Sequence, residues 1–535
     1  MYEEKNRYSI RLADIINPND GRAEKLGDMS PHTAREYVRR KRNILKKHYT
    51  SVNNTFAIRH GIYPIHSSGY SHYMVAELTP KEADSLRRDK DVISVTRFFE
   101  KRLITHQTDI ISRQIAADSI DGSHSPIFPP YLGNGVRLGI ISAQNLTFDP
   151  YSAQLDGLEE LGRLVYLDGR VASEQSVHSS AVTSLVIGQS VTIGTEQYRG
   201  VVPQSVVYFA PSFTKLSVYE AIEKCLDNGA VVVNYSAGEA FPDGNYSDFD
   251  RQIDTLIYNV GFCFVTSAGN ACIVSSPGTS YNGITVGNAI TKGTQTMEIP
   301  PPYPMFYIRE DDCSGYIQAD YLPNKPDLAA PGTYIHYIDS RGNLRLDLYG
   351  TSFAAPYVTG VAAQIAEKYP NASLLPLVMK TLILAGADSD VILEYDNPTV
   401  SSSDILRVKS GAGFLNSANA LGDIRFKSGV MLTDDTATHN LSERFELLAG
   451  QRVRILVCCM KSVENVALTF SRNNIVLEFY APDSSRVAVS NSPRENVKLI
   501  EYTVQSSGVY TAVCRLELFD PEGGNIPYVL AYRIA

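Results

Sequence analysis

Ser352 stands in a sequence setting that suits a hydroxyl nucleophile. It lies within Gly350 to Pro356, which reads Gly-Thr-Ser-Phe-Ala-Ala-Pro, and an apolar run follows over 357–363. Small neighbours let a substrate carbonyl approach the hydroxyl, and a helix start supplies backbone N–H groups and a positive dipole end. The motif therefore predicts a serine that attacks acyl groups at the N-terminus of a helix.

A serine hydroxyl needs a base within hydrogen-bond reach, and His178 is the candidate. Small residues follow it, and then an apolar stretch that ends at Gly188. A lone histidine is more often structural. A helix of small residues can pack closely under a site, however, and this context favours His178 as the general base.

Asn270 is the candidate donor to the oxyanion that forms in acyl transfer. It follows the apolar run 262–265 by a few residues. An amide at the carboxyl end of a buried strand can donate to the developing charge, with the backbone N–H of Ser352 as second donor. The alternative is a turn residue that tolerates a left-handed conformation.

The elements that must position these groups run from 106 to 422. Apolar runs occur at 136–141, 205–210, 230–234 and 262–265, and a helical stretch covers 216–228. Nearly continuous apolar strands are typical of a parallel sheet covered on both faces, in which sites form at the carboxyl ends of strands. We expect an α/β domain whose mainly parallel sheet is flanked by helices.

The flanking segments differ from this pattern. Residues 1–50 are polar and charged and are interpreted as an N-terminal extension with solvated helix faces. Residues 51–105 predict a small α+β domain, with strands at 73–78 and 92–98 and a helix between them that starts at the capping box 79–82 and continues to Asp91. Residues 428–535 predict an all-β sandwich or jelly roll, because short alternating strands are separated by turn signals.

Composition limits the classes of partner. The net charge is −9 and the sequence has no basic stripe, which argues against a nucleic-acid partner. No run approaches 18 apolar residues, which argues against a membrane span. The seven cysteines match no metal-ligand spacing, so we expect a reduced chain without a metal or cofactor. The first residues show no secretory signal, which predicts a cytoplasmic protein, or a secreted one if a leader was removed.

Residues 130–422 resemble the catalytic domain of the subtilisin-like serine proteases. Gly350 to Pro356 matches the nucleophile motif of that family, and 268–270 matches its oxyanion-asparagine motif. The stretch 178–188 is similar to its histidine motif, although Ser-Ser-Ala replaces the usual Gly-Thr-His after the histidine. Further matches, in the order of the family, lie at 200–203, 284–287, 327–332 and 411–418.

The resemblance implies a serine endopeptidase that acts on proteins or peptides. Ser352 would attack the peptide carbonyl, His178 would take and return the proton, and Asn270 would hold the oxyanion. The segment Ser236, Ala237 and Gly238 would be the strand on which an extended substrate adds, unless it is simply a turn at the end of a strand. Residues 51–105 would be an inhibitory propeptide, a partner within the same chain, and 428–535 an accessory sandwich.

The acid of the family's triad is missing. The row 133–144 ends in Ser142-Ala143-Gln144, and Ser142 stands where the family has aspartate. That aspartate holds the imidazole in its reactive tautomer, and its loss lowers kcat about 10⁴-fold in enzymes of this kind. Asp149 or Asp168 could substitute for it. Two hypotheses follow: an endopeptidase that is slow or uses a relocated acid, or a pseudoprotease that serves as a binding or regulatory scaffold.

Overall fold

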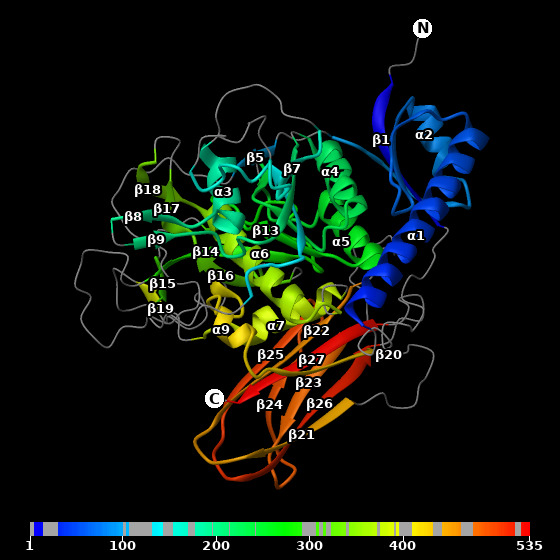
Figure 1. Cartoon of the computed structure of the whole chain (residues 1–535). Coiled ribbons are helices and arrows are strands. Elements are labelled where there is room, and N and C mark those ends of the chain that lie inside the picture. Colours follow the sequence, from blue (N-terminus) through cyan, green and yellow to red (C-terminus); the bar gives the residue numbers. More distant parts are fainter. Residues whose placement is uncertain are drawn as a thin grey trace.

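The structure is a computed structural model of the chain (Figure 1). It describes residues 5–13, 30–99, 103–105, 131–142, 153–168, 177–194, 196–212, 214–240, 242–291, 306–309, 314–316, 323–338, 342–371, 375–389, 392–394, 409–431, 441–461, 474–518 and 526–534. Three parts follow one another along the chain: an N-terminal α+β domain, a central α/β domain and a C-terminal β-sandwich.

The N-terminal domain packs two helices on a four-stranded antiparallel sheet. The strand order is β2-β3-β1-β4. The strands are β1 (Asn6–Leu12), β2 (Pro64–Ser67), β3 (Tyr73–Leu78) and β4 (Val92–Arg97), and the helices are α1 (Pro31–His60) and α2 (Pro80–Leu86). The expected capping box is present, since Thr79 and Glu82 bond each other's backbone N–H groups. The helix ends at Leu86, earlier than the sequence suggested.

The division of the chain at residue 50 was wrong. Residues 1–50 do not form a separate extension, because β1 lies between β3 and β4 in the sheet and α1 runs across the boundary. Ile10 of β1 and Phe56 of α1 are buried in one core. The many charges on the outer face of α1 hid its apolar stripe, which includes the buried residues Leu45 and Tyr49.

The central domain contains the expected mainly parallel sheet. Seven parallel strands follow the order β7-β10-β6-β11-β13-β14-β16. They are β6 (Arg137–Ser142), β7 (Leu164–Tyr166), β10 (Val206–Pro211), β11 (Val232–Tyr235), β13 (Cys263–Ser267), β14 (Ile284–Thr291) and β16 (Leu328–Pro331). At the edge, β15 (Phe306–Arg309) pairs antiparallel with β14, and β19 (Ile392–Glu394) pairs with β15.

Three short strand pairs lie outside this sheet. They are β8 (Val191–Ile193) with β9 (Glu196–Tyr198), β17 (Thr333–Ile338) with β18 (Leu344–Tyr349), and β12 (Ala237–Glu239) with β5 (Leu103–Thr105). The last pair joins segments more than a hundred residues apart in the chain, and it matters for the site below.

Helices cover both faces of the sheet. Gly139 of β6 and Val233 of β11 face α4 (Lys215–Asp227), because a Cβ at Gly139 would lie 2.7 Å from the sulfur of Cys225. The next residue of β11, Asn234, instead bonds Thr359 of α6 (Thr351–Lys368). Successive strand residues point to opposite faces, so α4 and α6 lie on opposite sides of the sheet.

The remaining helices extend these two layers. On the same side of the sheet as α4, α5 (Asp248–Val260) and α4 lie next to the N-terminal domain (Figure 1). Around α6 are α3 (Val177–Ile187) and α7 (Pro376–Gly386), with the short α9 (Ser417–Ala420) against α7. Small residues let α6 pack closely: a Cβ at Gly360 would lie 2.4 Å from that of Val201.

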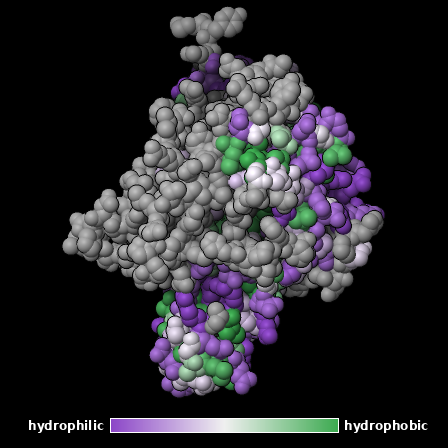
Figure 2. All heavy atoms as spheres, turned by 60° about the vertical axis from the view of Figure 1, so that its left-hand side comes forward, coloured by the Kyte–Doolittle hydropathy of each residue, from purple (hydrophilic) through white to green (hydrophobic). Residues whose placement is uncertain are grey.

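The C-terminal part is the expected sandwich of two antiparallel sheets. One has the order β20-β27-β22-β25 and the other β21-β26-β23-β24. Their strands are β20 (Arg425–Met431), β21 (Leu441–Leu447), β22 (Arg452–Cys459), β23 (Asn474–Tyr480), β24 (Arg486–Ser490), β25 (Val497–Thr503), β26 (Gly508–Leu518) and β27 (Ile526–Ile534). The sandwich packs on α7 through β22 and β27. Its described surface in Figure 2 mixes hydrophilic residues with small hydrophobic patches, as folded proteins generally do.

The cysteines differ in part from expectation. Cys458 and Cys459 are free, and they face opposite sides of β22, since they belong to different buried clusters. Cys272 is disulfide-bonded, which corrects the expectation of a fully reduced chain. An odd cysteine count and loop positions without regular spacing gave no signal for this bond.

No helix within the described ranges is both long and apolar enough to cross a membrane.

Candidate active site

The first turn of α6 presents Ser352. The helix follows β18 and starts at Gly350, whose φ of 130° lies in the region that favours glycine. No acidic residue occurs in its first turn. Ser352 is fully buried, and its Oγ donates to the backbone oxygen of Ser236 at 3.1 Å. The sequence thus places a buried hydroxyl at a helix N-terminus, where the dipole favours negative charge.

Asn270 caps this helix from another segment. Its Oδ1 accepts from the backbone N–H of Thr351 at 3.0 Å and from the Thr351 hydroxyl at 3.0 Å. The Thr351 Oγ1 in turn accepts from the N–H of Gly269 at 3.1 Å. Since the amide oxygen is held on Thr351, the NH₂ group points to the other side of the amide. A donor fixed in this way can meet an oxyanion without reorganising.

Thr351 is a positioning residue that sequence reasoning missed. Its hydroxyl joins the loop after β13 to the helix that carries the nucleophile, through Gly269 and Asn270. The signal was available, because a hydroxyl next to Ser352 at a helix start is a common capping group.

A buried polar network links α6 to the sheet. The Thr359 hydroxyl donates to Asn234 Oδ1 at 3.0 Å, and Asn234 Nδ2 donates to Ser236 Oγ at 2.9 Å. All three residues are buried, and the carbonyl of Ser236 accepts from Ser352. This network fixes the segment after β11 relative to the nucleophile. The sequence signal for this network was overlooked: Asn234 is a polar residue in an apolar strand, and Thr359 is a polar residue in an apolar helix.

The strand at Ser236, Ala237 and Gly238 already has a partner from the same chain. β12 pairs antiparallel with β5, with Ala237 opposite Thr105 and Gly238 opposite Ile104. The segment named as a substrate strand thus accepts an extended peptide as an added strand, and here that peptide is 103–105.

His178 lies in the first turn of α3, next to the nucleophile helix. The side chain is buried, with 4% exposed, and its ring centroid is 5.5 Å from that of Phe353. Phe353 directly follows Ser352, so the two helix starts meet. A hydroxyl has one proton, which Ser352 gives to the Ser236 carbonyl, so attack requires the hydroxyl to turn. Catalytic hydrogen bonds often tighten only when substrate is bound.

Ser142 lies at the carboxyl end of β6, beside the same turn of α3. Its Oγ is 2.7 Å from Oγ of Ser179, the residue after His178. Its carbonyl accepts from the N–H of Ser212 at 2.7 Å. Ser142 therefore ends a strand of the sheet, as the apolar run before it predicted, and its hydroxyl pairs with another neutral hydroxyl.

Of the two aspartates that could substitute for the acid, the structure describes only Asp168. Asp168 forms an ion pair with Lys224 of α4, so a cation already engages its charge. Asp149 lies outside the described residues. No group of three or more His, Cys, Asp or Glu side chains that could hold a metal ion occurs in the described part of the chain.

The chain matches known proteins over its central domain. The model of the subtilase family matches residues 164–417, which include His178, Asn270 and Ser352 but begin after Ser142. A subtilisin-like protease of Arabidopsis thaliana, SBT2.1, is 27% identical over 274 residues, which cover 42% of this chain and 32% of that protein. A thermostable alkaline protease of Halalkalibacterium halodurans is 24% identical over 307 residues, which cover 55% and 73% of the two chains.

Solved structures also match. The epidermin leader peptide processing serine protease EpiP of Staphylococcus aureus is 16% identical, with a TM-score of 0.49, over 78% of this chain and 98% of that one. The prenylagaramide maturation protease PagA is 22% identical, with a TM-score of 0.40, over 54% and 92%.

Proposed function

Because residues 164–417 match the model of the subtilase family, we propose that the chain is a serine endopeptidase with a Ser352–His178 centre, in which Ser142 replaces the triad acid. The observation that supports this most is the anchoring of Asn270 on Thr351, beside a buried Ser352. The same bonds that cap α6 also fix the direction of the amide NH₂ group, which the proposed chemistry requires.

The proposed reaction uses groups of this chain only. Ser352 Oγ attacks the peptide carbonyl carbon while its proton passes to His178, and the oxyanion is held by Asn270 Nδ2 and the Ser352 N–H. The C–N bond then breaks as His178 returns the proton to the leaving amine. Water, activated by the same imidazole, hydrolyses the acyl-enzyme.

The replacement of the acid by Ser142 limits the turnover that we propose for this site. It carries no charge to stabilise the imidazolium, so turnover should be about 10⁴-fold below that of an enzyme with the acid. The oxyanion donors and substrate binding alone still accelerate such reactions about 10³–10⁴-fold over water. Slow proteolysis is therefore compatible with the site as it stands.

The N-terminal domain is the first substrate that the proposal implies. β5 runs along β12 toward Ser236, where the hydroxyl of Ser352 is bonded, so the peptide bond presented should follow β5 directly. In this role the domain is a propeptide, and 103–105 occupies the substrate strand until the cut.

Mass spectrometry of the purified chain tests this proposal. Wild type should release an N-terminal fragment that ends just after β5, and Ser352→Ala should stay intact. If both chains remain whole after prolonged incubation, with no peptide hydrolysis, the proposal fails. Asp149→Ala and Asp168→Ala, tested separately, would show whether either carboxylate supports His178: the one that does should slow the cut strongly, and the other should not.

One observation favours a second function. The neutral Ser142–Ser179 pair, together with a substrate strand filled by 103–105, also suits a pseudoprotease that binds or regulates without turnover. An uncut wild-type chain that binds extended peptides once β5 is deleted would favour this scaffold over the enzyme.

A further inference from the structure

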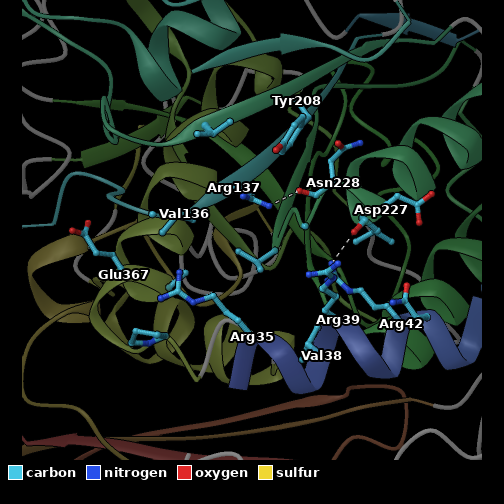
Figure 3. Close-up of a pocket in the computed structure, with 18 of the residues that line it drawn as sticks. Arg35, Val38, Arg39, Arg42, Val136, Arg137, Tyr208, Asp227, Asn228 and Glu367 are labelled. Carbon is cyan, nitrogen blue, oxygen red and sulfur yellow. Dashed lines mark hydrogen bonds between the residues drawn. The ribbon is translucent and has the colours of Figure 1, made fainter. Parts of the chain in front are cut away.

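A cavity lies far from Ser352, between the N-terminal and central domains. It has a volume of about 840 Å³ and separates α1 from the amino ends of β6 and β10 (Figure 3). Four arginines and two carboxylates are among the side chains that line it: Arg35, Arg39, Arg42, Arg137, Asp227 and Glu367. Positive charge is therefore in excess at this cavity.

Both carboxylates already have partners. Asp227 forms an ion pair with Lys46 and accepts from the hydroxyl of Tyr70 at 2.7 Å. Glu367 accepts from the backbone N–H of Gly133 at 2.6 Å. Lys46 offsets the charge of Asp227, and the four arginines outnumber the two acids in the lining of the cavity.

Arg42 has a structural role in the same wall. Its guanidinium donates to the carbonyls of Leu226 and Ala230 at 3.0 and 3.2 Å and to that of Gly261 at 3.3 Å. It thus satisfies backbone oxygens at or just after the C-terminal ends of α4 and α5 and ties α1 to both. Burial lowers the pKa of Arg42 to about 10, so it remains charged at neutral pH.

The other three arginines are exposed and come from two domains. Arg35 and Arg39 rise from α1, and Arg137 lies on the opposite wall, at the start of β6 (Figure 3). Arg137 donates to the carbonyl of Asn228 at 3.2 Å. A Cβ at Gly229 would lie 3.1 Å from its Nη1, so the glycine makes room for this guanidinium.

We propose that this cavity binds a small polyanion with at least two phosphate or carboxylate groups, held between Arg35 and Arg39 on one side and Arg137 on the other. Planar guanidinium groups bond phosphate and carboxylate through paired N–H donors. The volume is that of sites for small molecules. The lining also includes the apolar residues Val38, Val136 and Leu226, which could contact the uncharged part of the ligand.

This site is separate from the peptide-cleaving centre. Glu367 lies near the end of α6 and Ser352 near its start, about 22 Å apart along the helix at 1.5 Å per residue. A ligand here would contact the N-terminal and central domains together. The ligand would bind more tightly when the N-terminal domain is docked on the central domain than when the two are apart. This difference in affinity would stabilise the docked state.

Isothermal titration of the full Ser352→Ala chain tests the proposal, because the N-terminal domain then stays attached. The probes are tripolyphosphate and citrate at low and high ionic strength. Saturable binding of at least one probe, weakened by salt, is expected. Arg39→Gln and Arg137→Gln should each weaken it about tenfold or more, since charge-assisted bonds are lost.

Arg40→Gln is the matched control. Arg40 is on the same helix, pairs with Glu36 and does not line the cavity. The affinity of the Arg40→Gln variant for the probe should stay within about twofold of the parent, because the binding energy comes from groups that contact the ligand and distant exposed charges are screened by salt. Absence of saturable binding for both probes, or equal losses in all three variants, would overturn the proposal. Arg39 is exposed, so its variant should fold, and a melting curve of each variant verifies this.

Discussion

The two sides of the candidate active site are built very differently. On the nucleophile side, Asn270 and Thr351 form three hydrogen bonds at the start of α6, and the Ser236 carbonyl accepts from Ser352. On the acid side, the corresponding place at the end of β6 holds one bond between two hydroxyls, Ser142 and Ser179. The groups that would bind an oxyanion are thus fixed by several bonds, whereas the group that would support the imidazolium has no charge.

This difference indicates which part of catalysis the fold supplies by itself. Orientation of the nucleophile and of the oxyanion donor comes from backbone and amide groups that α6 and β13 bring together. Stabilisation of the imidazolium needs a carboxylate, and no packing contact replaces it. Substitutions on the two sides should therefore have opposite effects, and the following predictions run from the complete loss of activity to the smallest loss on the nucleophile side.

Ser352→Ala should remove all hydrolysis above background, because the attacking atom is lost. In related enzymes that have the acid, removal of the nucleophile lowers kcat about 10⁶-fold and removal of the acid alone about 10⁴-fold, so we expect a loss of about 100-fold from this chain, which already lacks the acid. The measurement is hydrolysis of a fluorogenic peptide after an added protease has removed the N-terminal domain from both proteins. Ser417→Ala, a buried serine on α9, is the control and should retain activity. Equal residual rates in wild type and Ser352→Ala would contradict the nucleophile side of the comparison.

Ser142→Asp should raise kcat, by up to about 10⁴-fold, because it restores a charge beside the first turn of α3. Ser142→Ala, which removes the hydroxyl without adding charge, should change kcat less than tenfold, as a neutral hydrogen bond contributes about 1 kcal/mol. An aspartate at 142 that leaves kcat unchanged would show that the supporting acid comes from elsewhere in the chain.

Asn270→Ala should lower kcat about 10²–10³-fold with little change in KM, because the amide acts on the oxyanion. Asn270→Asp is the sharper comparison. It keeps an oxygen for the Thr351 N–H but lacks the NH₂ donor, so it should lose kcat while the melting temperature is preserved. Only the alanine should lose about 1 kcal/mol of stability through the lost cap. Full activity in Asn270→Asp would exclude the NH₂ group as a donor.

Thr351→Val should lower kcat about tenfold, the smallest loss expected on the nucleophile side, because it removes bonds that orient Asn270 without touching substrate. Thr351→Ser keeps the hydroxyl and should restore most of the activity. A loss in Thr351→Ser as large as in Thr351→Val would assign the role to packing of the methyl group.

Much of the fold could be predicted from local sequence. Apolar runs such as 136–141 and 230–234 correspond to β6 and β11, and the capping box at Thr79 correctly starts α2. Ser352 was predicted at a helix start because its short motif is sufficient for a local inference. These features depend on residues close together in the chain.

The features that were missed depend on distant segments. β1 joins the sheet through pairs that are far apart along the chain, such as Ile10 with Met74, 64 positions away, and with Val95, 85 positions away. The bond between Ser142 and Ser179 and the pairing of β5 with β12 likewise join remote residues. Periodicity reports which face of an element is buried, but it does not identify the partner.

Labelling with a fluorophosphonate probe tests the central claim most directly, since the reagent reacts only with an activated serine hydroxyl. The account predicts slow, saturable labelling of wild type at Ser352, identified by peptide mapping, and none in Ser352→Ala. A wild-type chain that remains unlabelled once its N-terminal domain is removed would contradict it, and so would equal labelling of Ser352→Ala.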